Sequence, residues 1–238
     1  MNGLEDEGIA SVEFKLFGKM SFTVTDPVAL IEAFCFQSDF YSNYDVVPVK
    51  ERKMQHANRI GARINKELLP RAQRVIEETS ALELFQYDDS LDRFLQLDSE
   101  RVREIVDEFN EKAVKGLLTK GIGLSKATKI LHTFHPETVP MIDNPLEKLY
   151  SIQINSGWDE GEPGIFVDYY NNFREGFTWR NLKLISQKLR SAGLALTEVR
   201  VFDILWWSCL KSMNLNKRLD EENRKTIDWL TLQVVSHL

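Results

Sequence analysis

The stretch from Leu117 to Leu131 constrains the fold most strongly, because it encodes two helices joined by a tight turn. The turn reads Gly121-Ile122-Gly123, so two permissive glycines flank an apolar side chain that can fill the space between the helices. Apolar residues then recur at i, i+3, i+4 and i+7 from Ala127, which predicts the second helix. We expect a helical hairpin over about residues 112–134, with turn amides that favour an anion such as a phosphate.

This segment resembles the helix-hairpin-helix of the DNA glycosylase superfamily that includes endonuclease III, the adenine-mismatch glycosylase and the 8-oxoguanine glycosylases. An essential aspartate follows the hairpin at a fixed interval in that superfamily, and Asp143 occupies its position when the two are laid together without gaps. Members that also cut the strand carry a nucleophilic lysine just after the hairpin. Ser125, eighteen positions before Asp143, stands at that position here, and Lys126 does not. The resemblance covers roughly residues 114–150.

The resemblance implies a DNA-base N-glycosylase that removes a damaged, modified or mismatched base from double-stranded DNA. Breaking the glycosidic bond develops positive charge on the sugar, which a carboxylate stabilises while it orients the attacking water. Asp143 is the candidate for this role. It is also well placed to cap a helix that begins at Asn144-Pro145, and a helix N-terminus keeps a carboxylate ionised, so both interpretations hold together.

Ser125 predicts a monofunctional enzyme, because a serine cannot form the Schiff base through which a lysine permits strand cleavage. Ser125, Lys129 and His132 share one face of the expected helix, opposite its apolar stripe. Lys126 points elsewhere, and a shift of one residue would be needed to bring it into the site. We expect DNA contacts from Gly121, Ile122, Gly123, Lys126 and Lys129, with solvent exposure as the alternative for both lysines.

The composition excludes several kinds of centre. Two cysteines, Cys35 and Cys209, cannot supply a four-cysteine iron–sulfur cluster, and both are expected to be buried thiols in a reducing compartment. His132 and His135 lie three residues apart without a suitable cysteine or glutamate, so no metal site and no cofactor are predicted. The net charge of −6 counts against a general DNA binder unless basic residues gather on one face.

No apolar run is long enough to span a membrane, and the acidic start Met-Asn-Gly-Leu-Glu-Asp-Glu lacks a signal-peptide core. These features predict a cytoplasmic protein without a membrane partner.

The rest of the chain predicts a mainly α fold with a minor β-hairpin. Alternating apolar residues over 10–25 indicate the hairpin, which is expected to pack, as an element of residues 1–25, on a multi-helix glycosylase-like domain of residues 26–238. Asp26, Asp98 or Ser99, Thr178 and Thr197 are predicted helix caps. The expected helices span residues 28–36, 50–64, 70–84, 99–109, 144–152, 178–193, 198–211 and 218–235.

Several side chains have two readings. Arg59 and Arg63 share a helix face that suits contact with either a DNA backbone or solvent. The spacing of Arg200 and Asp203 predicts a surface ion pair. Trp158, Tyr150 and Trp179 are candidates for the walls of a base pocket, whereas Trp206 and Trp207 are expected in the core.

Two other functions remain open. One is a helix-hairpin-helix module that binds nucleic acid without catalysis, with Asp143 as a structural cap. The other is a helical protein-interaction domain in which the hairpin is incidental.

Overall fold

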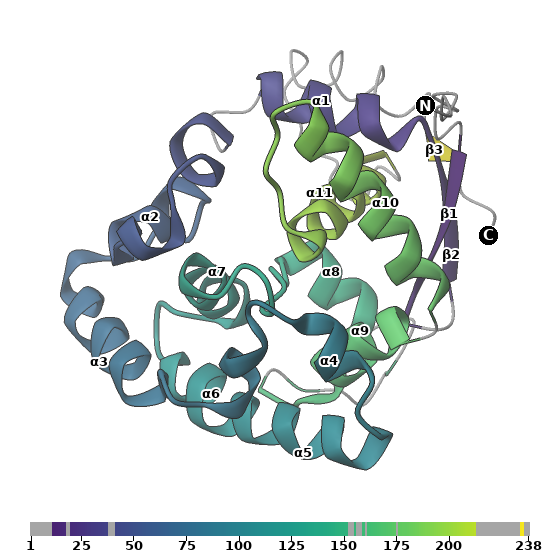
Figure 1. The fold of residues 1–238 in the computed structure, drawn as a ribbon. Helices are drawn as coiled ribbons and strands as arrows, with labels where there is room; N and C mark the ends of the chain where they lie inside the picture. The colour runs from purple at the N-terminus through teal and green to yellow at the C-terminus, as the bar shows by residue number, and fades with distance from the viewer. Residues whose placement is uncertain are drawn as a thin grey trace.

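The computed structural model describes residues 11–17, 20–37, 41–151, 155, 159, 161–174, 176–212 and 234–235. Within these residues the protein is mainly helical, with one small antiparallel sheet at the edge of the helical body (Figure 1). This agrees with the coarse fold predicted from the sequence. No helix of the described part is both long enough and apolar enough to cross a membrane.

The sheet begins with β1 (Ser11–Leu16) and β2 (Met20–Thr25), which pair antiparallel with Phe14 opposite Phe22. The residues of β1 alternate strictly between exposed and buried, as a half-buried strand requires. Phe14 and Phe22 stack with ring centroids 5.4 Å apart, and Phe22 lies 5.0 Å from Trp206. The apolar face of the hairpin therefore packs on the C-terminal helices.

A short third strand corrects the prediction for the C-terminus. Val234 and Val235 form β3 and pair with Val24 and Thr23 of β2. β-branched valines suit this edge pairing better than the end of a helix. The expected helix over 218–235 is thus wrong at these two positions, and its residues 218–233 lie outside the described part of the chain.

The N-terminal helices follow local signals only in part. Asp26 caps α1 (Pro27–Gln37) by accepting from Ala29 N at 3.0 Å, as predicted. The helix expected over 50–64 is broken: a short turn at Val49–Glu51 precedes α2 (Met54–Arg59). Gly61 and Arg63 then take positive φ, which an α-helix cannot accommodate. α3 (Leu69–Thr79) likewise ends before residue 84, and separate turns occupy Tyr41–Asp45, Lys66–Leu68 and Glu83–Tyr87.

The central helices lead directly to the predicted hairpin. α4 (Leu91–Leu95) is followed by α5 (Ser99–Phe109), which Asp98 caps by accepting from Arg101 N at 2.8 Å. α5 continues through a π-helical turn, Asn110–Val114, into α6 (Lys115–Leu117). After the glycine turn, α7 (Leu124–Phe134) lies in the interior, in contact with α2 and α8 (Asn144–Leu149) (Figure 1).

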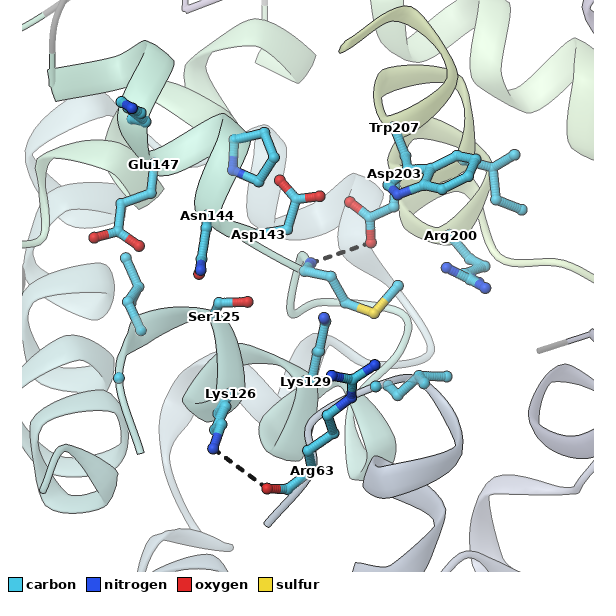
Figure 2. A pocket seen from close by; sticks show the side chains of 18 of the residues that line it. Arg63, Ser125, Lys126, Lys129, Asp143, Asn144, Glu147, Arg200, Asp203 and Trp207 are labelled. Atoms are coloured by element: carbon cyan, nitrogen blue, oxygen red, sulfur yellow. Dashed lines mark hydrogen bonds between the residues drawn. The ribbon is translucent and has the colours of Figure 1, made fainter. Parts of the chain in front are cut away.

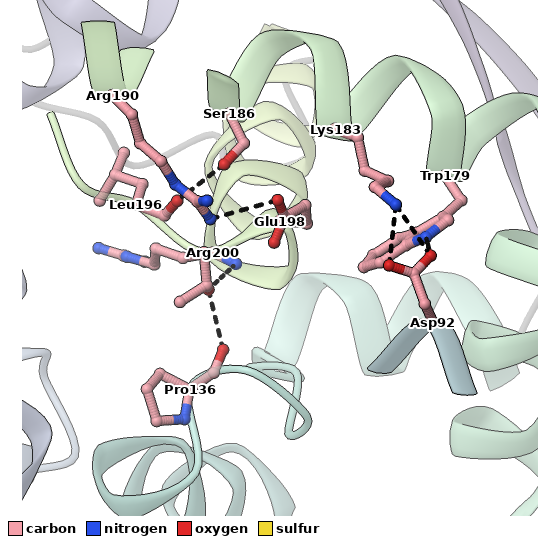
Figure 3. Close-up of polar contacts among 10 residues, drawn as sticks. Asp92, Pro136, Trp179, Lys183, Ser186, Arg190, Leu196, Glu198 and Arg200 are labelled. Carbon is pink, nitrogen blue, oxygen red and sulfur yellow. Dashed lines mark hydrogen bonds and ion pairs between the residues drawn. The ribbon is translucent and has the colours of Figure 1, made fainter. Parts of the chain in front are cut away.

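Three further helices follow in the described part of the chain: α9 (Gly164–Arg174), α10 (Phe177–Ser191) and α11 (Glu198–Ser212). Thr197 caps α11 by accepting from Arg200 N at 3.0 Å, as predicted. Thr178 does not cap α10, because that helix already begins at Phe177; its hydroxyl instead accepts from Lys15 N of β1 at 3.3 Å. Polar contacts tie these helices to the body: Asp92 of α4 accepts from Trp179 and Lys183 of α10 (Figure 3).

Candidate functional site

The glycine turn between α6 and α7 is tight and closed on itself. Thr119 and Ile122 exchange both backbone hydrogen bonds, at 3.0 and 2.9 Å. Gly121 lies between them at φ +102°, a conformation that glycine adopts without strain. Ile122 is buried, so the apolar residue of the turn fills the space between the helices as predicted.

The outer side of the turn presents backbone donors. Within the described residues, the amides of Gly121, Gly123 and Ser125 donate to no backbone carbonyl. The Lys126 ammonium folds back onto the turn and donates to the carbonyls of Gly121 at 2.9 Å and Arg63 at 3.3 Å. The turn amides thus remain available to an anion, while Lys126 binds the carbonyl groups on the other side of the turn.

A pocket of about 870 Å³ opens beside this turn (Figure 2). Its walls come from α1, from the loop after α2, from the first turns of α7, from the start of α8 and from α11. The polar and aromatic residues that line it include Phe34, Arg63, Ser125, Lys126, Lys129, Asp143, Glu147, Lys148, Arg200, Asp203 and Trp207. The sequence-predicted candidates Asp143, Ser125, Lys126, Lys129 and Gly123 therefore share one cavity.

Asp143 is the N-cap of α8 and also lines the pocket. Its Oδ1 accepts from Leu146 N at 3.0 Å, so the predicted cap is confirmed. The carboxylate is half-buried and faces the cavity in Figure 2. The helix N-terminus behind it attracts negative charge.

Helix α7 holds the segment that carries Asp143. The buried Thr128 hydroxyl accepts from Ile142 N at 3.1 Å and lies 3.1 Å from the carbonyl of Leu124. His132 Nδ1 donates to the Val139 carbonyl at 2.6 Å. His132 was expected opposite the apolar stripe, on the face of Ser125 and Lys129, but it is completely buried. Burial lowers its pKa to about 3, so that it stays neutral.

Lys129 projects into the pocket one turn after Ser125, as the helical spacing predicts. Burial lowers the pKa of its ammonium, the Asp143 carboxylate opposes that shift, and Arg63 adds to it. Among the described residues its ammonium makes no hydrogen bond, and it lies close enough to Gly61 that a Cβ there would come within 3.7 Å. Its charge therefore acts on the cavity and on Asp143.

Arg200 and Asp203 correct a prediction, because neither belongs to a surface ion pair. The Arg200 guanidinium pairs with Asp45, at 2.9 Å from Nε to Oδ1 and 3.1 Å from Nη2 to Oδ2, and both side chains are buried. Asp203 accepts from Met141 N and Tyr169 Oη, each at 3.1 Å. An i, i+3 spacing only places two residues on one helix face; α11 is buried on nearly every side.

Burial raises the pKa of Asp203 to about 8. Arg200 and the two hydrogen bonds from Met141 and Tyr169 oppose this shift, whereas the nearby Asp143 carboxylate adds to it. Of the three carboxyl groups that line the pocket, Asp143 and Asp203 thus lie in unlike surroundings.

The aromatic wall consists of two residues that were not predicted to line the pocket. Phe34 of α1 and Trp207 of α11 line the pocket with ring centroids 5.9 Å apart. Trp206 is buried as expected, but Trp207 is half-buried and faces the cavity rather than the core. The tryptophan pair alone could have suggested this, since adjacent helical residues point about 100° apart.

Other candidates lie elsewhere. Tyr150 donates to Asp168 at 2.7 Å and Trp179 to Asp92 at 2.7 Å, and neither lines the pocket. Trp158 lies outside the described residues. Of the arginine pair, Arg63 lines the pocket and Arg59 does not. The described part contains no cluster of histidine, cysteine and acidic residues that could hold a metal ion.

Cys35 is a buried free thiol, and burial raises its pKa to about 12, which leaves it unreactive at neutral pH. The side chain of Cys209 lies outside the described residues.

No protein-family model, curated protein or solved structure matches this chain.

Proposed function

We propose that this protein is a DNA-base N-glycosylase of the helix-hairpin-helix type, monofunctional, in which Asp143 supports the attack of water on the glycosidic bond. The observation that carries the proposal is the meeting of Asp143, Ser125 and Lys129 in one pocket beside the glycine turn. These residues come from the N-terminal parts of two separate helices. The superfamily resemblance places Asp143 and Ser125 in the same site.

The proposed chemistry uses the charge of Asp143. As the base leaves, the sugar gains positive charge, and a fixed carboxylate stabilises it without reorganisation. The capping bond from Leu146 N fixes the carboxylate, and the helix dipole and the nearby Lys129 ammonium both attract negative charge at its position. We take water as the nucleophile: Ser125 has no amine at the superfamily's lysine position, the Lys126 ammonium is engaged by two carbonyls, and the Lys129 ammonium is assigned as the positive partner of Asp143.

The pocket is suited to an extruded base. A glycosylase must hold the flipped nucleotide between aromatic or apolar walls, and a cavity of about 870 Å³ walled by Phe34 and Trp207 offers that environment.

The local charge also supports a nucleic-acid partner. The chain has a net charge of −6, yet five basic residues and only three acidic residues line the pocket. The free amides of the glycine turn adjoin this basic region and would hold a backbone phosphate. Basic residues gathered at one place can bind phosphates even when the whole chain is acidic.

A non-catalytic nucleic-acid-binding module is the second candidate. The observation that favours it is the cap itself: the bond to Leu146 N gives Asp143 a sufficient structural role without any chemistry.

The test is base release from duplexes carrying uracil, oxidised guanine, alkylated purines or simple mismatches, with alkali added to reveal abasic sites. Asp143→Asn should lower release at least about 100-fold while preserving the fold, because asparagine caps helices as well as aspartate. Asp98→Asn is the matched control, since Asp98 caps α5 in the same way and does not line the pocket.

Release that survives in Asp143→Asn would refute the catalytic assignment. Salt-dependent DNA binding without release from any duplex would favour the binding module. If the logarithm of the binding constant for duplex DNA does not change with the logarithm of the salt concentration, nucleic acid is not the partner.

A further inference from the structure

We propose that Asp203 is a second catalytic carboxyl group, the general acid that protonates the base as it leaves, and that the substrate is an uncharged base whose departure requires this proton. This inference rests on the proposed glycosylase function. It starts from one juxtaposition: the carboxyl groups of Asp143 and Asp203, which come from the start of α8 and from α11, face each other in the same pocket (Figure 2).

The two groups lie in environments of opposite character. Asp143 is half-buried at a helix N-terminus beside the Lys129 ammonium, two features that attract negative charge. Asp203 is 7% exposed and sits deep between α9 and α11. When two carboxyl groups share a site but differ in proton affinity, one can act as the acid and the other as its charged partner.

The groups that face Asp203 come from three elements. Burial raises its pKa to about 8, so it carries its proton at neutral pH. Arg200 opposes the shift, but its guanidinium is already engaged by Asp45. The titratable and charged neighbours are Arg200 from α11, Tyr169 and Tyr170 from α9 and Asp143 from the start of α8.

Two donors fix the orientation of the acid. Tyr169 Oη donates to Oδ1 and Met141 N donates to Oδ2, each at 3.1 Å. Each carboxyl oxygen offers more than one site, so these bonds leave room for the acidic proton while preventing rotation of the group. Because Met141 lies two residues before Asp143, the same contact sets the distance between the acid and its partner.

In the proposed step, one bond breaks at the sugar carbon and one forms there. The bond between the sugar C1′ and the base nitrogen breaks, its electron pair stays with the base, and the Asp203 proton transfers to a ring nitrogen of that base. Water adds its oxygen to C1′ and gives its proton to Asp143. Asp143 then releases that proton to solvent and Asp203 takes one up from solvent, which restores both groups. No metal, oxidant or further reactant is consumed.

The experiment compares two leaving groups: the base that the wild-type protein releases, and analogues of it whose electron-withdrawing substituents let it leave without a proton. Asp203→Asn should lower release of the natural base about 100-fold and release of the most activated analogue no more than about 3-fold. Ser208→Ala is the control, because it removes a buried hydroxyl of the same helix that donates to the Ile204 carbonyl and does not line the pocket; it should leave both rates close to those of the wild type.

Equal losses for both leaving groups in Asp203→Asn would show a structural role and overturn the inference while leaving the glycosylase intact. No release of any base by the wild-type protein would overturn the proposed function, and this inference with it. The wild-type pH profile needs no variant: release of the natural base should fall as the pH rises above about 8, and the activated analogue should not follow. A flat profile for both would contradict the assignment.

Discussion

Replacing Thr128 with valine tests how α7 positions the candidate site. Valine keeps the shape of threonine but removes the hydroxyl that accepts from Ile142 N at 3.1 Å. Both residues are completely buried, so the Ile142 amide would be left without this acceptor and without access to bulk water. An unsatisfied buried donor costs about 1–3 kcal/mol, and we expect Thr128→Val to lower the free energy of unfolding by about 2 kcal/mol.

Thr79→Val is the matched control. Thr79 is also a buried helical threonine, but its hydroxyl only donates back to the Val75 carbonyl at 2.6 Å, and no amide depends on it. Its replacement should change the free energy of unfolding by less than about 0.5 kcal/mol, because the helix retains its backbone bonds.

The assay is urea unfolding followed by tryptophan fluorescence. With a slope of about 2 kcal/mol/M, the expected loss lowers the urea midpoint of Thr128→Val by about 1 M, and Thr79→Val should stay close to wild type. If Asp143 is catalytic, Thr128→Val should also reduce base release at urea-free conditions, since Ile142 immediately precedes Asp143. Equal stability losses in the two valine variants would show that the bond between Thr128 and Ile142 does not hold this segment.

Three further outcomes are expected. Arg200→Met should cost roughly 3–5 kcal/mol in the free energy of unfolding, because it leaves Asp45 buried without its partner; a loss under about 1 kcal/mol in thermal or urea unfolding would contradict this. Borohydride should trap no covalent adduct with a substrate duplex, and an adduct that disappears in Lys129→Ala would instead identify that amine as a nucleophile. Gly121→Ala should weaken duplex binding in a fluorescence anisotropy titration, because it forces a side chain to φ +102° with its Cβ 3.2 Å from a leucine methyl. Gly193→Ala is its control: that residue lies at φ +87° in open space, so the variant should lose comparable stability without losing duplex binding.

Local signals predicted much of this fold. The caps at Asp26, Asp98, Asp143 and Thr197 all form, because each depends on a side chain that reaches a backbone amide three residues away. The glycine turn and the alternation of the N-terminal hairpin are equally local, and both appear as expected.

The predictions that were wrong depend on tertiary contacts. Asp203 and Arg200 read as a surface pair because the sequence shows their spacing but not that α11 is surrounded by other helices. The break after α2 arises where Asn58 Oδ1 accepts from Ile64 N at 2.6 Å, a closure that competes with helix and that helical periodicity does not reveal. The sequence could not assign Phe34 to the pocket, because it lies on α1, almost one hundred residues before α7 in the chain. Only the tertiary fold brings these two helices to the same cavity.

The place of Asp143 explains why the same residue can be predicted on structural and on functional grounds. A capping aspartate is fixed by the helix that it begins, and the same helix end favours the charge that a developing cation requires. The Met141–Asp143 segment is held from two sides, by Thr128 of α7 and by Asp203 of α11. A carboxylate that is positioned by three separate contacts need not move when a base enters, and this preorganisation is what transition-state stabilisation demands. The stability of the helix start and the proposed chemistry are therefore two consequences of one arrangement, which asparagine at position 143 would separate.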